Sequence, residues 1–176
     1  WQIGEMGRLD LGGGGTIAKY VANRGIKVLD MTKVLAGPYC GMMLRNLGAE
    51  VIHCEMPGSG DDARAYGPYV EGQSIYFLSI NRGKKSLEVN AKTPEGKKVL
   101  TDLVKNVDVF VQNFKPGALD KMGFGYEDVK KINPRCVYVA ISGFGQTGPY
   151  SGRPAYDMIV QAMGGVMSIT GEPNGN

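Results

Sequence analysis

Long hydrophobic runs, histidine and paired cysteines are all scarce in this chain of 176 residues. The apolar runs are short and interrupted, so no segment is expected to span a membrane. Glu5, Arg8 and Asp10 stand where a secretory signal would need an apolar stretch. The three cysteines form an odd set without metal-ligand spacing, which predicts no metal site and favours a reducing compartment. We therefore expect the cytoplasm or the mitochondrial matrix.

A large excess of charge of one sign is also missing. Twenty Lys and Arg residues face seventeen Asp and Glu residues, which gives a net charge of +3. Basic pairs such as Lys84-Lys85 are scattered along the chain rather than gathered among aromatic residues, so no nucleic-acid partner is predicted. Because 43% of the residues are hydrophobic and 21% charged, intrinsic disorder of the whole chain is excluded and a folded core is expected.

Residues 1–24 differ in pattern from the rest of the chain. They contain a run of four glycines that begins at Gly12. A phosphate-binding P-loop would close on Gly-Lys-Ser/Thr, whereas Gly15 is followed by Thr16 and Ile17. We interpret residues 1–24 as a flexible or atypical lead segment and residues 25–176 as part of one domain.

Strand and helix patterns alternate from residue 25 onward. The segments with strand patterns are 26–30, 50–55, 85–90, 107–111 and 136–142. The segments with helix patterns are 37–47, 74–80, 93–104, 119–122, 126–132 and 156–167. Strands separated by helices require right-handed crossovers, so the sequence predicts an α/β fold with a mostly parallel, doubly wound sheet. In such a sheet the ligand binds at the carboxyl ends of the strands.

Two glycine motifs follow predicted strands, and both are predicted to be turns. Residues 143–148 match the dinucleotide pattern G-x-G-x-x-G, but Pro149 would break a helix starting there. Residues 58–63 match more loosely, and Asp61 and Asp62 would repel a diphosphate. Nicotinamide binding is therefore not favoured at either motif.

Two further residues could carry chemistry but have simpler interpretations. His53 is the only histidine and lies within a predicted strand, so a half-buried structural side chain is favoured over a catalytic base. Asp157 stands at the start of the last predicted helix, where a carboxylate stabilises the helix N-terminus. A catalytic role for Asp157 is the alternative.

Eight short segments stand in a fixed order along the chain: 28–38, 47–52, 57–64, 81–86, 108–117, 122–126, 143–149 and 156–157. Together they resemble the class III CoA-transferases of the CaiB/BaiF type, over essentially residues 25–176. The residues of these segments are most similar to those of the succinyl-CoA:glutarate branch. The resemblance implies a Rossmann-like large domain, of which this chain is the N-terminal part. It also implies an interlocked homodimer for the full-length protein.

The resemblance implies transfer of CoA from an acyl-CoA donor to a carboxylic acid, with a dicarboxylic acceptor favoured. In this family an aspartate attacks the thioester and forms a covalent intermediate. By residue-by-residue matching that aspartate lies beyond Asn176, so no catalytic residue is expected in this chain, and the truncated chain alone is expected to be inactive. No cofactor is expected to stay bound, because coenzyme A or acyl-CoA is the substrate.

The resemblance also implies which residues bind CoA. These positions are Val34, Leu35, Val89, Lys92, Asn113, Phe114, Lys121 and Met122. Lysines suit the phosphates, an aromatic ring suits adenine, and an amide offers both a donor and an acceptor. Leu35 and Met56 stand where formyl-CoA transferases carry glutamine and arginine, which does not favour the formyl/oxalate substrate pair.

Two alternatives stay open. The α-methylacyl-CoA racemases of the same superfamily place a histidine base directly before the aspartate that matches Asp157. Here Tyr156 holds that position, and a phenol with a pKa near 10 is a poor base at neutral pH, so transfer is favoured. The other alternative is a CoA-binding fragment without catalytic activity.

Overall fold

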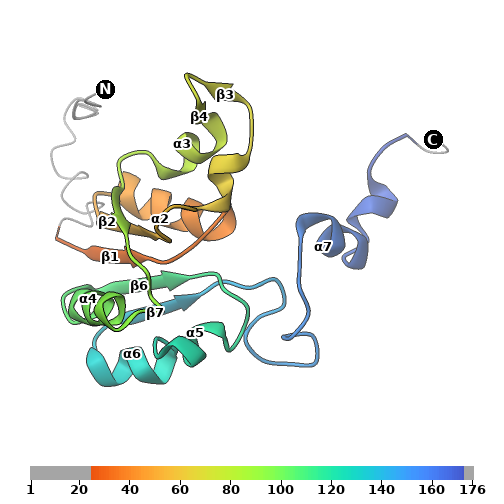
Figure 1. The fold of residues 1–176 in the computed structure, drawn as a ribbon. Coiled ribbons are helices and arrows are strands. Elements are labelled where there is room, and N and C mark those ends of the chain that lie inside the picture. Colours follow the sequence, from red (N-terminus) through yellow and green to blue (C-terminus); the bar gives the residue numbers. More distant parts are fainter. Residues whose placement is uncertain (1–24, 173–176) are drawn as a thin grey trace, which may run out of the picture.

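Five parallel strands form one sheet with helices on both faces in the computed structural model, which describes residues 25–172 (Figure 1). The strands are β1 (Lys27–Asp30), β2 (Glu50–Glu55), β5 (Lys85–Glu88), β6 (Val109–Gln112) and β7 (Val137–Ala140). Their order is β5-β2-β1-β6-β7. Successive strands are added on one side of β1 up to β5, and then on its other side from β6 onward. This is the doubly wound α/β topology that the sequence predicts, with its switch point at β1 and β6. The predicted lead segment 1–24 lies outside the described residues.

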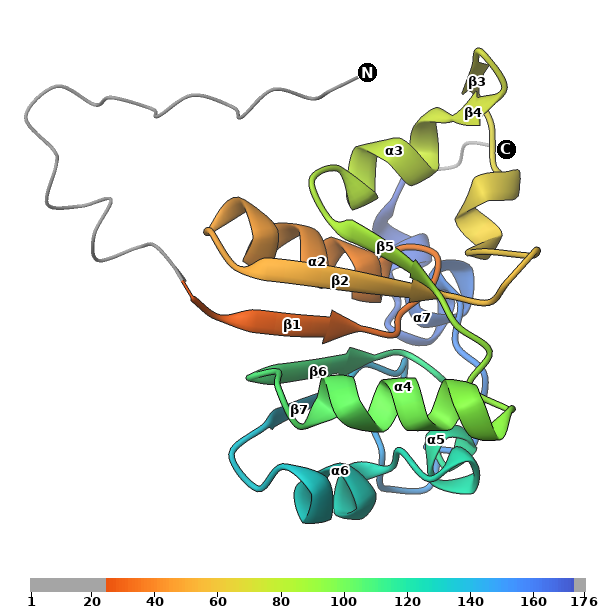
Figure 2. The ribbon, with the colours of Figure 1, turned by 60° about the vertical axis from the view of Figure 1, so that its left-hand side comes forward.

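Helices cover the sheet in two layers (Figure 2). The helices are α2 (Ala36–Asn46), α3 (Ile75–Asn81), α4 (Pro94–Val104), α5 (Ala118–Met122) and α6 (Tyr126–Ile132). On one side α2 contacts the sheet and α3 packs on α2, while α4 and α6 lie together on the other side. Between β2 and α3 the chain forms a 3-10 helix (Asp62–Ala65) and a hairpin of β3 (Tyr69–Val70) and β4 (Gln73–Ser74). These last three elements were not predicted from the sequence.

Alternating side chains of the strands supply one hydrophobic core on each face. Val28 of β1 and Val51 of β2 pack in the core on the α2 side. Leu29 packs with Leu100 of α4 in the core on the opposite side. Burial on both faces accounts for the nearly continuous apolar strands of a parallel sheet. The spacing of Val99, Leu100, Leu103 and Val104 in the sequence predicts one apolar face for α4, but Val99 is 44% exposed.

The helix predicted over residues 156–167 is wrong in its length. The structure has α7 (Asp157–Met163) followed by a separate 3-10 helix (Val166–Ile169). Gly164 and Gly165 separate the two, and Gly165 has a φ of +76°, which an α-helix cannot continue through. This C-terminal segment stands away from the sheet (Figure 1). None of the helices within residues 25–172 has the length and apolar character needed to cross a bilayer.

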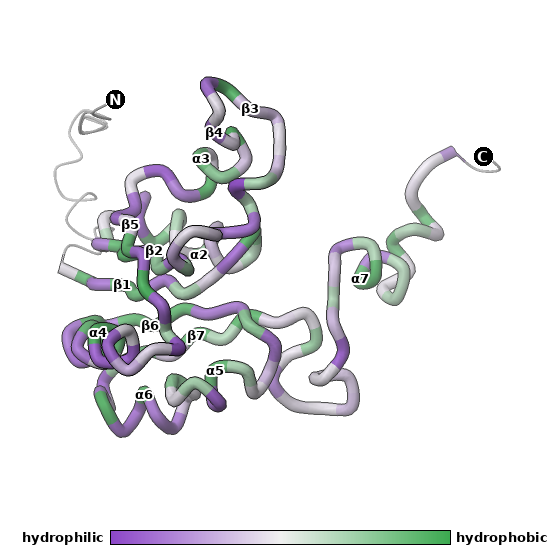
Figure 3. The backbone as a smooth tube through the Cα atoms, viewed as in Figure 1, coloured by the Kyte–Doolittle hydropathy of each residue, from purple (hydrophilic) through white to green (hydrophobic). Residues whose placement is uncertain are grey.

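Several residues of the C-terminal segment are hydrophobic (Figure 3). Their side chains are exposed. Neither α7 nor the 3-10 helix after it has a buried residue. Tyr156 is 76% exposed and Ile169 is 84% exposed. Asp157 lies in the first turn of α7, and its carboxylate accepts a hydrogen bond from Gln161. This placement fits the expected role in stabilising the helix start.

Candidate functional site

The loops after β1 and β6 are joined at the switch point of the sheet. The Asn113 Oδ1 atom accepts a hydrogen bond from the Lys33 backbone N–H at 2.8 Å, and Asn113 Nδ2 donates to the Lys33 carbonyl at 2.7 Å. The two segments are 80 residues apart in sequence. Asn113 therefore fixes the loop that carries Val34 and Leu35 against the loop that carries Phe114.

Three of the apolar positions expected to bind CoA come together on one core. Val89 follows β5, Phe114 follows β6 and Met122 ends α5, yet all three are half-buried and pack against the same hydrophobic cluster. The Phe114 backbone N–H donates to Gln112 Oε1 at 2.8 Å, which holds the start of its loop. Of the other five expected positions, Val34 and Asn113 are half-buried, and Leu35, Lys92 and Lys121 are exposed.

A cavity of about 470 Å³ has a lining that includes none of the eight expected positions. It is lined by residues of the β6–α5 loop, α5, α6, β7 and the loop after β7: Gln112, Lys115, Pro116, Gly117, Leu119, Asp120, Tyr126, Tyr138, Ala140 and Gln146. It therefore opens at the carboxyl ends of β6 and β7, next in sequence to Phe114 and Lys121. The glycine motif over residues 143–148 forms turns here, and no helix begins within it, as predicted.

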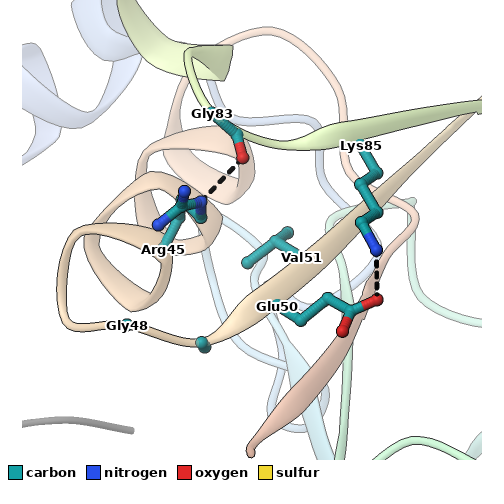
Figure 4. A pocket seen from close by; sticks show the side chains of 7 residues that line it. Arg45, Gly48, Glu50, Val51, Gly83 and Lys85 are labelled. Atoms are coloured by element: carbon teal, nitrogen blue, oxygen red, sulfur yellow. Dashed lines mark hydrogen bonds and ion pairs between the residues drawn. The ribbon is translucent and has the colours of Figure 1, made fainter. Parts of the chain in front are cut away.

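A second cavity, of about 270 Å³, lies at the opposite ends of the strands (Figure 4). Arg45 Nε donates to the Gly83 carbonyl at 2.7 Å, and Lys85 pairs with Glu50 at 2.7 Å across its wall. These contacts use the polar groups that line the cavity. Because ligands of doubly wound sheets bind at the carboxyl ends, this second cavity is not the candidate site.

Four charged side chains form a buried ionic cluster between the sheet and α2. They are Asp30, His53, Asp61 and Lys84, and each side chain is at most 2% exposed. His53 Nδ1 lies 3.3 Å from Asp30 Oδ2, and His53 Nε2 lies 3.6 Å from Asp61 Oδ2. The prediction from the sequence that His53 is half-buried is wrong. The cluster itself was not predicted.

Lys84 and Thr32 complete the contacts of Asp30. The Lys84 ammonium donates to Asp30 Oδ2 at 2.9 Å, to the Pro38 carbonyl at 2.8 Å and to Asn81 Oδ1 at 2.7 Å, so its three protons are all used. The Thr32 backbone N–H donates to Asp30 Oδ1 at 3.0 Å, and the Thr32 hydroxyl donates to the same oxygen. Within residues 25–172, no three His, Cys, Asp or Glu side chains are grouped as metal ligands would be.

Two glycines let α2 approach this cluster. A Cβ atom on Gly41 would lie 2.5 Å from Asp30 Oδ2, and a Cβ atom on Gly37 would lie 2.3 Å from Thr32 Cβ. Gly37 and Gly41 are four residues apart and therefore share one face of the helix. The small residues of α2 are thus required by the polar side chains that it covers.

The charges in the cluster shift one another's titration. Burial disfavours the charged form of His53, but Asp30 and Asp61 outweigh it and raise the pKa of His53 to about 9. Burial would raise the pKa of Asp30 and of Asp61, yet the facing His53 holds both pKa values below their usual range, with Lys84 contributing at Asp30. At neutral pH the cluster therefore holds two cations and two carboxylates.

A second ion pair borders the cluster. Glu55 is buried, and its carboxylate accepts from Arg64 Nε at 2.7 Å, from Arg64 Nη2 at 2.6 Å and from the Asp61 backbone N–H at 2.8 Å. The guanidinium of Arg64 also lies over the Phe77 ring, 3.7 Å from its centroid. This forked contact orients the turn that brings Asp61 inward.

Comparison with known proteins decides the family of this chain. A sequence model of CoA-transferase family III matches residues 24–176. The chain belongs to CoA-transferase family III. Succinyl-CoA:glutarate CoA-transferases of Mus musculus and Homo sapiens are 53% and 52% identical over 153 residues, which are 86% of this chain and 35% of each relative. Acetyl-CoA:oxalate CoA-transferase of Acetobacter aceti is 51% identical over 151 residues, 86% of this chain and 39% of that relative.

Solved structures of the family share the fold. A CaiB/BaiF family protein from Brucella suis matches with a TM-score of 0.82 and 47% identity, over 87% of this chain and 42% of that chain. A hypothetical protein from Mycobacterium tuberculosis matches with a TM-score of 0.78 and 38% identity, over 87% of this chain and 42% of that chain. The family, its CaiB/BaiF type and the similarity to the succinyl-CoA:glutarate branch are thus confirmed. The chain spans little more than a third of the length of the curated relatives compared above.

Proposed function

We propose that this chain supplies the acyl-CoA-binding part of an enzyme that moves CoA from an acyl-CoA donor to a dicarboxylic acid. Membership of family III supports CoA transfer, and the relatives compared above are named for glutarate or oxalate, both dicarboxylates. One structural observation supports the proposal most directly. Six of the expected positions stand in the loops that follow β1, β5 and β6, at the carboxyl ends of these strands, and Lys121 and Met122 end α5, the helix after the β6 loop.

Each of these positions has a group suited to one part of CoA. Lys92 and Lys121 are exposed cations that can meet phosphates. Phe114 is half-buried, so one part of its ring is anchored in the core while the rest can lie against adenine. Asn113 contributes by position, because both ends of its amide already hold the Lys33 backbone.

The transfer itself would proceed through a carboxylate nucleophile. An aspartate attacks the acyl-CoA thioester carbonyl, which forms a mixed anhydride and releases the CoA thiolate. The thiolate attacks the aspartyl carbonyl and releases the donor acid, leaving an aspartyl thioester. The acceptor carboxylate then displaces CoA as a thiolate, and the thiolate takes the acceptor acyl group and frees the aspartate. The resemblance assigns this aspartate to a position after Asn176. Asp157 is not this aspartate, because it lies in the first turn of α7 and stabilises the start of that helix.

We further propose that residues 25–176 form the N-terminal part of the large domain, and that the full-length enzyme works as an interlocked homodimer. The apolar side chains of α7 and the following 3-10 helix support this, because no residue of either element is buried within the described chain. Exposed apolar surface of this kind is typical of a face that another polypeptide segment covers.

A turnover assay tests the proposed function. The protein is mixed with succinyl-CoA and glutarate, and glutaryl-CoA is followed by chromatography alongside a calorimetric titration with CoA. The chain of 176 residues should bind CoA without turnover, and a polypeptide extended past Asn176 through the expected aspartate should turn over. Catalysis by the shorter chain would refute the assignment of the nucleophile. Binding without transfer by the longer chain would instead favour the alternative of a non-catalytic CoA-binding protein.

A further inference from the structure

His53 stands between two carboxylates that come from different segments. Asp30 ends β1, and Asp61 belongs to the loop after β2. Among the described residues, the two His53 ring nitrogens are the only buried side-chain nitrogen or oxygen atoms without a hydrogen bond of regular geometry. Their contacts at 3.3 and 3.6 Å are therefore ion pairs. A neutral imidazole would turn a nitrogen lone pair toward one of the carboxylates, so this geometry favours protonation of both nitrogens.

The groups around His53 balance only when it is charged. Asp30 and Asp61 face it directly, Lys84 pairs with Asp30, and Glu55 nearby is neutralised by Arg64. From α3 the neighbour is the Phe77 ring, with its centroid 6.3 Å from that of His53. From α2 and β2 the titratable groups near Asp30 are the thiols of Cys40 and Cys54, whose pKa values burial and Asp30 raise, so they stay neutral. Loss of the His53 proton would leave a buried carboxylate without a counter-charge.

Asp61 is the carboxylate that depends on His53. Asp30 keeps the Lys84 ammonium at 2.9 Å, whereas the ion pair of Asp61 within the cluster is the one with His53. The other oxygen of Asp61 accepts the Val34 backbone N–H at 2.9 Å and the Ala63 N–H at 2.9 Å. His53 thus holds Asp61 from one side while Asp61 holds the β1–α2 loop from the other.

Val34 needs this support because its backbone is strained. Its φ is +67°, in the left-handed region that a β-branched residue rarely adopts. The hydrogen bond from the Val34 N–H to Asp61 spans 27 residues of sequence and fixes that conformation. The next residue, Leu35, is exposed at the carboxyl edge of the sheet. The loop that bears two of the expected CoA positions is therefore set by a buried carboxylate.

We propose that His53, as an imidazolium, is a positioning residue: it fixes Asp61, which in turn holds the Val34–Leu35 loop in the shape that binds acyl-CoA. The ligand in this inference rests on the proposed function, whereas the link from His53 to Val34 rests on the contacts alone. His53 does not touch the substrate. Its deprotonation at alkaline pH releases the loop and weakens acyl-CoA binding.

A nuclear magnetic resonance titration tests the link without any variant. His53 is the only histidine, so its ring C2–H signal needs no assignment. It should titrate with a pKa of about 9, and the 15N-labelled Val34 amide should shift with the same midpoint. A histidine midpoint near its ordinary value of 6.5, or a Val34 amide that does not follow it, would overturn the inference.

Substitutions test whether charge or shape matters. His53→Lys keeps a cation, and His53→Gln removes it. At neutral pH, His53→Gln should bind CoA about tenfold more weakly, while His53→Lys should stay near the original affinity. The original protein should lose affinity between neutral pH and about pH 10, and His53→Lys should not. Lys85→Gln, which breaks the exposed pair with Glu50, is the matched control and should change nothing.

A second variant separates loss of the charge from loss of the fold. If His53→Gln does not fold, Asp61→Asn keeps an acceptor for the Val34 N–H but removes the charge, and it should lower the His53 midpoint by more than about one pH unit. An unchanged midpoint in Asp61→Asn would contradict the inference. If neither the original protein nor any variant binds CoA at any pH, the proposed function fails. The nuclear magnetic resonance titration still tests the link between His53 and Val34.

Discussion

The side-chain amide of Asn113 and the backbone of Lys33 exchange two hydrogen bonds, at 2.8 and 2.7 Å, across the switch point of the sheet. This pair joins the loops that follow β1 and β6, the two strands between which the order of the sheet reverses. The two hydrogen bonds therefore hold both loops together at the edge of the sheet where a doubly wound fold binds its ligand. The resemblance assigns Asn113 to CoA contact, and the structure adds this positioning role.

Removing that pair should weaken CoA binding. We expect Asn113→Ala to lower the affinity by up to about thirtyfold, because two hydrogen bonds are lost and each contributes about 1 kcal/mol. Calorimetric titration with CoA measures the effect. Asn106→Ala is the control, since Asn106 bonds an exposed carbonyl at the end of α4, away from the switch point. Equal affinities in the two variants would show that the Asn113 bridge does not shape the site.

The close approach of α2 to the ionic cluster predicts a loss of stability in Gly41→Ala. The new Cβ would lie 2.5 Å from Asp30 Oδ2, so either the helix or the carboxylate must shift. We expect the free energy of unfolding in urea to fall by about 1–3 kcal/mol, the usual cost of overpacking. Gly152→Ala, where a Cβ meets no atom within 4 Å, should be unchanged. A Gly41→Ala protein as stable as Gly152→Ala would contradict the packing described for α2.

The raised pKa of His53 predicts how stability depends on pH. The folded state holds the proton up to a pKa of about 9, whereas the unfolded chain releases it near 6.5. The stabilisation is therefore complete below 6.5 and is lost as the pH rises through about 9. Between these values the free energy of unfolding should fall by up to about 1.4 kcal/mol per pH unit.

Urea unfolding across this pH range measures that slope, with His53→Gln as the comparison. The pKa of the Cys54 thiol is raised from 9.0 to about 12, so this thiol changes the stability only at pH values above 9. Below pH 9 the slope therefore reports the titration of His53. The slope should vanish in His53→Gln. A slope that persists in the variant, or that is missing in the original protein, would assign the pH dependence to another group.

Much of the fold was predictable because local signals agree with it. The limits of β2 and α6 match the sequence pattern. Thr93, Pro94 and Glu95 form a typical helix start, and the Thr93 side chain does cap α4 by accepting a hydrogen bond from the Gly96 N–H. The ionic cluster was not predictable in this way. His53 meets Asp30 because β1 pairs with β2 in the register that places the two residues side by side, and Lys84 arrives from a position 54 residues after Asp30. Such contacts depend on tertiary pairing.

A weaker signal for the cluster was present in the strands. Asp30 follows Val28 by two residues in β1, and His53 follows Val51 by two residues in β2. Residues two apart in a strand share one face, so each polar residue lies on the same buried face as its apolar neighbour. A polar residue at such a position needs a partner, which would have grouped Asp30 with His53. The left-handed backbone of Val34 had no local signal, because β-branched residues disfavour it.

The most direct test of the whole account is a calorimetric titration with CoA at low and high salt. Lys92→Gln and Lys121→Gln should each weaken binding by about 1–3 kcal/mol, and by less at high salt, because exposed cations pair with phosphates. Phe114→Ala should weaken binding equally at both salt concentrations, since ring contact is not Coulombic. Lys98→Gln, on the exposed side of α4, is the control and should leave affinity unchanged. Affinity that is unaltered in all three site variants would contradict the assignment of the carboxyl edge as the acyl-CoA site.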